Sequence, residues 1–82
     1  MSLGEIEKEV AEVVNKITGK EIVQNEYSTH FFSDKIGLTP FYLIYIFFAL
    51  QEKYNIQFER EEILEEKLVS IKETAKAILG RV

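Results

Sequence analysis

The chain has 82 residues, no cysteine and a formal net charge of −4, so it predicts one domain, residues 1–82, with a modest core and no disulfide or thiol chemistry. The excess of acidic over basic residues argues against nucleic-acid binding. The longest apolar run is about half of what a membrane span needs. With no basic start or apolar signal core in Met1–Glu5, we expect a cytoplasmic protein without a membrane span.

A first helix is predicted from Ser2 to Thr18. Ser2 and Glu5 have the spacing of a capping box, and Gly19 is a typical helix end. Apolar residues recur at helical spacing and are expected to face the core. They are Ile6, Val10, Val13, Val14 and Ile17.

A long segment from Lys20 to Leu38 follows this helix. It is polar, but enough apolar residues punctuate it to pack it down on the core as an ordered loop. These expected anchors are Ile22, Val23, Tyr27, Phe31, Phe32 and Ile36. Ser33–Gly37 predicts a short turn before the next element.

The central element is the apolar stretch that begins at Pro40. Its aromatic and Ile-rich composition also suits a buried strand, but its length, about four helical turns up to Tyr54, favours a helix. Thr39 is a good N-cap, whose hydroxyl we expect to accept a backbone hydrogen bond, and proline suits the first helical position. We therefore predict a helix from Pro40 to Tyr54.

This helix has two apolar faces on a helical wheel, where a surface helix needs one. The face expected in the core holds Leu43, Ile46, Phe47, Leu50 and Tyr54. The opposite face holds Phe41, Tyr45, Phe48 and Glu52, with Tyr42 and Ile44 on the flanks. In so small a chain we expect the second face to be partly exposed, although Phe31, Phe32 and Ile36 of the long loop offer an alternative cover.

The C-terminal third predicts two more helices. Asn55 ends the central helix, and the acidic segment Glu59–Glu66 is expected to form a short helix with Ile63 and Leu64 facing inward. Ser70 and Glu73 have capping-box spacing. The last helix is expected to end at Gly80 and to bury Ile71, Ala75, Ile78 and Leu79. The fold class is thus all-α, a bundle of three main helices and one short helix.

The order of these elements resembles the acyl carrier protein family. The resemblance runs from about Ile6 to Leu79 and is most specific between Phe32 and Phe58, where Ile36-Gly37 precedes a helix that ends Ala49-Leu50-Gln51-Glu52-Lys53-Tyr54. It implies a four-helix bundle with a long loop after the first helix. Family members carry Asp-Ser-Leu at the start of the second helix, and the serine is esterified to 4′-phosphopantetheine. Here those three positions hold Thr39, Pro40 and Phe41.

Pro40 has no hydroxyl, so the resemblance implies a carrier-related module without an attachment residue or cofactor. The family's second helix is usually acidic, whereas here it is aromatic. The partner-binding residues implied are Phe41, Tyr42, Tyr45, Phe48 and Glu52. The partner expected is a biosynthetic or modifying enzyme, as for the acyl-carrier-related proteins of bacterial, bacteriocin-type peptide maturation systems.

Two alternatives stay open. One is a functional acyl or peptidyl carrier, modified with 4′-phosphopantetheine at Thr39 or another hydroxyl. The other is a protein that uses its second helix as a homodimer interface or as a binding site for a hydrophobic ligand. We predict no enzymatic activity, no catalytic residues and no metal site, and we expect the single histidine, His30, to have a loop or capping role.

Overall fold

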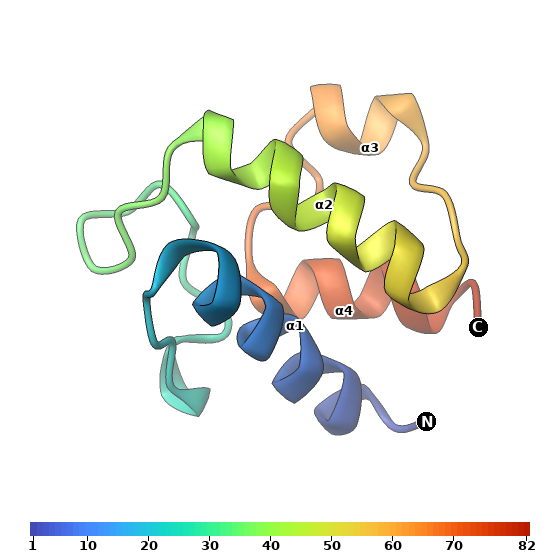
Figure 1. Cartoon of the computed structure of the whole chain (residues 1–82), viewed down its shortest axis with the longest axis horizontal. Coiled ribbons are helices and arrows are strands. Elements are labelled where there is room, and N and C mark those ends of the chain that lie inside the picture. Colours follow the sequence, from blue (N-terminus) through green and yellow to red (C-terminus); the bar gives the residue numbers. More distant parts are fainter.

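The computed structural model describes all 82 residues and contains four α-helices and no strand (Figure 1). The helices are α1 (Leu3–Thr18), α2 (Pro40–Tyr54), α3 (Arg60–Leu64) and α4 (Ile71–Leu79), and a single 3₁₀ turn, η1 (Gln24–Glu26), lies in the long connection between α1 and α2. The predicted all-α class, the long first connection and the bounds of the central helix are confirmed.

Helix α1 begins and ends as its sequence predicts. The Ser2 hydroxyl accepts from the Glu5 N–H at 3.2 Å, and the Glu5 carboxylate accepts from the Ser2 N–H at 3.1 Å. This second bond stabilises the charged carboxylate and lowers the pKa of Glu5 below its ordinary value. Gly19 ends the helix with φ of +76°, in the left-handed region that glycine adopts without strain.

The core lies where α1 packs against α4 and α2. Fifteen buried hydrophobic residues form one cluster, so the molecule has a single core. Helices α1, α2 and α4 each contribute three hydrophobic residues from one inward face, whereas α3 contributes none. They are Ile6, Val10 and Val14 from α1, Ile46, Phe47 and Leu50 from α2, and Ile71, Ala75 and Ile78 from α4.

The long connection is held down by backbone hydrogen bonds. The Phe31 N–H donates to the Val69 carbonyl at 2.7 Å, and the Lys72 N–H donates to the Tyr27 carbonyl at 2.9 Å. Both bonds join the connection to the start of α4. Phe31 is fully buried, and Ile22, Ile36 and Leu38 of the same connection are almost completely buried.

Two residues that were predicted to anchor this connection to the core do not do so. Val23 and Phe32 are both exposed. Each is adjacent to a buried neighbour, Ile22 and Phe31, and in non-helical backbone successive side chains point in different directions. One residue of each pair therefore reaches the core and the other faces out.

Three inward residues were also predicted wrongly in the C-terminal third. Leu64 is 66% exposed and Ile63 is exposed as well, because α3 is only five residues long and lies at the edge of the bundle beside α2 (Figure 1). Leu79 is exposed, whereas Thr74 is fully buried. The inward stripe of α4 is centred one residue earlier than its apolar pattern suggests.

Candidate interaction surface

Helix α2 begins at Pro40 without a side-chain cap. Thr39 has the extended backbone of an N-cap residue (φ −104°, ψ 159°), but its hydroxyl accepts no hydrogen bond, so the predicted hydroxyl cap is wrong. The Thr39 carbonyl instead accepts from the Tyr42 N–H at 3.1 Å. Pro40 fixes φ and lacks an N–H, and this end of the helix is exposed to water, so a cap is less needed.

The inner face of α2 is the one predicted. Ile46, Phe47 and Leu50 are buried, and Leu43 and Tyr54 are partly buried against the core. The Tyr54 hydroxyl donates to the Glu9 carboxylate of α1. Burial and then this hydrogen bond to a carboxylate raise the pKa of the Tyr54 phenol well above its ordinary value. Tyr54 thus links α2 to α1.

The opposite side of α2 is exposed. We call it the outer face, made up of Phe41, Tyr42, Tyr45, Phe48 and Glu52. Phe41 is 65% exposed, Phe48 61% and Tyr45 53%. The rings of Phe41 and Tyr45 meet edge to face, with centroids 5.4 Å apart. The long loop does not cover this face, because its Phe31 is in the core.

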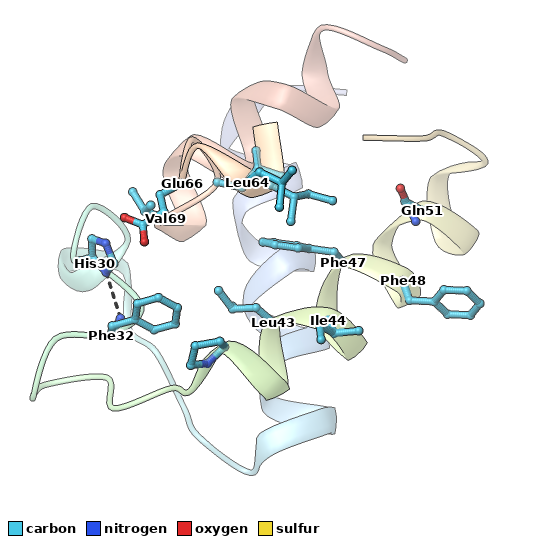
Figure 2. A pocket seen from close by; sticks show the side chains of 13 residues that line it. His30, Phe32, Leu43, Ile44, Phe47, Phe48, Gln51, Leu64, Glu66 and Val69 are labelled. Atoms are coloured by element: carbon cyan, nitrogen blue, oxygen red, sulfur yellow. Dashed lines mark hydrogen bonds between the residues drawn. The ribbon is translucent and has the colours of Figure 1, made fainter. Parts of the chain in front are cut away.

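An apolar groove lies beside the outer face, between α2 and α3. Its volume is about 470 Å³, and nine of its thirteen lining residues are hydrophobic. The lining is His30, Phe32, Pro40, Leu43, Ile44, Phe47, Phe48, Gln51, Ile63, Leu64, Glu66, Leu68 and Val69. In Figure 2 the Phe47 ring lies between Leu43 and Leu64, whereas the Phe48 ring points away from them. We call it the α2–α3 groove.

Sequence reasoning missed this groove. Ile63 and Leu64 are adjacent apolar residues on a five-residue helix, which has no further apolar residue at i+3 or i+4 to extend a core stripe. No sequence signal therefore shows which way these two side chains face. Together with Ile44, they form the exposed apolar walls of the groove.

The polar groups of the groove are few. His30 Nδ1 accepts from the Phe32 N–H at 3.0 Å, in agreement with the predicted loop role, so in the neutral ring the proton is on Nε2. The Gln51 side chain accepts from the Phe58 N–H at 2.9 Å. Glu66 follows the end of α3 with φ of +55°, in the left-handed region.

Negative charge dominates the α3 side of the groove. Residues 59–67 hold five glutamates against Arg60 and Lys67. The Glu62 carboxylate pairs with the guanidinium of Arg81, and Glu65 lies 3.7 Å from the Lys67 amine. Glu61 and Glu66 form no ion pair. Of these glutamates Glu66 lines the groove, and we call residues 59–67 the acidic border on its α3 side.

Comparisons of this chain with known protein families, curated proteins and solved structures find no match. No three His, Asp or Glu side chains are grouped closely enough to bind a metal ion. None of the four helices combines the length and apolar composition required to cross a bilayer. The features that point to a function are therefore the outer face and the groove beside it.

Proposed function

We propose that this chain is an acyl carrier protein-like binding module that carries no 4′-phosphopantetheine and docks to a biosynthetic or peptide-modifying enzyme through the outer face of α2. The observation that carries the proposal is that Pro40 starts α2 and that exposed aromatic residues follow it along the helix. Proline offers no oxygen to esterify, and the aromatic residues offer a contact surface.

The element order supports the carrier-like part of the proposal. A long connection after α1, a central α2, a short acidic α3 and an α4 capped by the Ser70 hydroxyl all agree with what the family resemblance implies. In that family a helix start with free N–H groups faces the phosphodiester. Here the same position holds Thr39 and Pro40.

The size of the exposed apolar surface supports docking. Phe41, Tyr45 and Phe48 are each more than half exposed, and together they present roughly 400 Å² of apolar side chain. Contiguous patches of several hundred Å² on a soluble domain mark interaction sites. Aromatic residues are also the side chains most enriched among binding hot spots.

Site-specific photo-crosslinking in the source cell tests this function. A photoreactive phenylalanine derivative at Tyr45 is expected to capture one enzyme. The matched control carries the same group at Val23, an exposed apolar position in the long connection. Capture of the same set of proteins from both positions, or of none from Tyr45, would contradict the proposal.

One observation favours a second candidate, a functional carrier modified at Thr39. The Thr39 hydroxyl is exposed and makes no capping bond, so it is free to react. Incubation with coenzyme A and a promiscuous phosphopantetheinyl transferase, followed by intact-mass analysis, decides between the two. We expect no gain in mass. A gain that disappears in Thr39→Ala would establish the carrier function instead.

A further inference from the structure

We propose that the α2–α3 groove binds an amphipathic helix of the docking partner, with the apolar face of that helix in the groove and basic residues along its edges. This inference rests on the proposed function and adds where the partner inserts and what its segment is made of. It concerns the groove, which adjoins the outer face and shares only Phe48 with it.

The groove walls require an apolar occupant. Leu43, Ile44 and Phe47 line it from α2, and Ile63 and Leu64 line it from α3. Its volume of about 470 Å³ lies in the range of sites that take several apolar groups. Apolar side chains displace water favourably from such a surface.

Backbone hydrogen bonding selects a helix over an extended peptide. The chain has no strand, so the groove offers no sheet edge to pair with a peptide backbone. An extended segment laid in an apolar groove would leave backbone N–H and C=O groups unpaired, and each buried unpaired group weakens binding. A helix satisfies its own backbone and presents only side chains.

The length of the groove fits such a helix. It extends along α2 from Pro40 to Gln51, which is about 16 Å at the rise of an α-helix. About three turns of a partner helix cover this distance. Apolar anchors at positions i, i+4 and i+7 of that helix would span about 10 Å and fit between the two ends.

The acidic border selects the charge of the occupant. Glu66 lines the groove without an ion pair, and it holds a left-handed conformation that glycine or asparagine adopts at lower cost. Glu61 on α3 also lacks a partner. Lysine or arginine beside the apolar anchors would pair with Glu66, and the net negative charge of residues 59–67 would add to the attraction.

The same acidic border disfavours two other possible occupants of the groove, a second copy of this chain and a fatty acid. A second copy of this chain would bring another acidic 59–67 segment to the first, and like charges across an interface cost binding energy. A fatty acid would place its carboxylate in the same negative field. A basic amphipathic helix is the occupant that satisfies both the apolar walls and the charge.

Two peptides of about fourteen residues with one shared apolar face test the inference. One carries lysine and arginine along the edges of that face, and the other carries glutamate at the same positions. Backbone amide NMR spectra of the ¹⁵N-labelled protein are followed during titration with each peptide. We expect the basic peptide to bind at least about tenfold more tightly and to shift the signals of Ile44, Phe47 and Leu64.

Variants locate the binding. Leu64→Glu and Ile44→Glu place a charge in the groove at exposed positions, so the fold is retained, and each is expected to abolish binding of the basic peptide. Val23→Glu, exposed elsewhere, is expected to leave it unchanged. No binding of the basic peptide at millimolar concentration, equal binding of both peptides, or shifts confined to Phe41 and Tyr45 would overturn the inference.

Two further measurements separate this inference from the proposed function. Photo-crosslinking from Tyr45 reports on the outer face alone, so capture there combined with failure of the peptide rejects only the groove assignment. Sedimentation equilibrium of the free protein tests for a second copy. We expect a monomer, and a dimer that Leu64→Glu dissociates would overturn the inference.

Discussion

Thr74 is the residue at which the core departs most from its expected chemistry. It is fully buried on the inward stripe of α4, and its hydroxyl has no hydrogen-bond partner. Burying an unpartnered hydroxyl costs free energy that a methyl group of similar shape does not. The apolar spacing of α4 in the sequence predicts Leu79 on this stripe instead of Thr74, since a threonine gives no hydrophobic signal.

Thr74→Val is therefore expected to raise the free energy of unfolding by about 1 kcal/mol, measured by urea denaturation. Thr18→Val is the matched control. The Thr18 hydroxyl donates to the Val14 carbonyl at 2.7 Å and accepts from the Lys20 N–H at 3.1 Å, so its removal is expected to lower stability. An equal change in the free energy of unfolding at the two sites would show that the Thr74 hydroxyl does form a hydrogen bond in the folded protein.

Gly37 fixes the turn that delivers the chain to α2. Its φ is +66°, and its N–H donates to the Ser33 carbonyl at 2.6 Å. Gly37→Ala is expected to lower the free energy of unfolding by about 1 kcal/mol, because a Cβ is strained in the left-handed region.

Gly4→Ala is the control for this substitution. Gly4 lies in the first turn of α1, where an added Cβ meets nothing within 4 Å. Alanine is the better helix former, so this change is expected to raise the free energy of unfolding by about 0.5 kcal/mol. The same thermal or urea measurement serves both variants, and the same sign at both glycines would contradict the account of the turn.

The elements that the sequence predicted best are those with strong local signals. The capping box of Ser2 and Glu5, Gly19 after α1, and Pro40 with Asn55 at the ends of α2 each fixed a helix boundary. The orientation of α3 could not be predicted in the same way. A five-residue helix is too short to define a face, so tertiary packing decides whether Ile63 and Leu64 point inward.

The contact between α1 and α2 makes a prediction about alkaline pH. The folded state raises the pKa of the Tyr54 phenol, so the phenol ionises first in the unfolded chain. Its contribution to stability is therefore complete below its ordinary pKa near 10 and is lost as the pH rises above that value.

Tyr54→Phe removes this contribution. We expect it to lower the free energy of unfolding by about 1 kcal/mol at neutral pH, because Glu9 loses its donor. The difference from the wild type is expected to shrink as the pH is raised past about 10. Tyr45→Phe, which removes an exposed hydroxyl that makes no hydrogen bond, is the control and is expected to leave stability at neutral pH unchanged. A difference for Tyr54→Phe that grows with pH would contradict the assignment.

At the scale of the whole molecule, the sequence predicted the number and order of the helices and the exposure of the outer face. The prediction held because α2 has two apolar faces and the remaining helices supply enough surface to cover only one. The α2–α3 groove could not be predicted. It depends on how α3 is placed beside α2, which no local pattern in residues 59–66 specifies.

The affinity of the double variant Phe41→Ala, Tyr45→Ala for the enzyme captured from Tyr45 tests the central claim most directly. Isothermal titration calorimetry of that enzyme with the wild type, the double variant and Val23→Ala gives the three affinities, and thermal unfolding checks that all three are folded. We predict that the double variant loses at least about thirtyfold in affinity, a hot-spot loss of about 2 kcal/mol, while Val23→Ala binds as the wild type does. Unchanged affinity of a folded double variant would contradict docking through the outer face of α2.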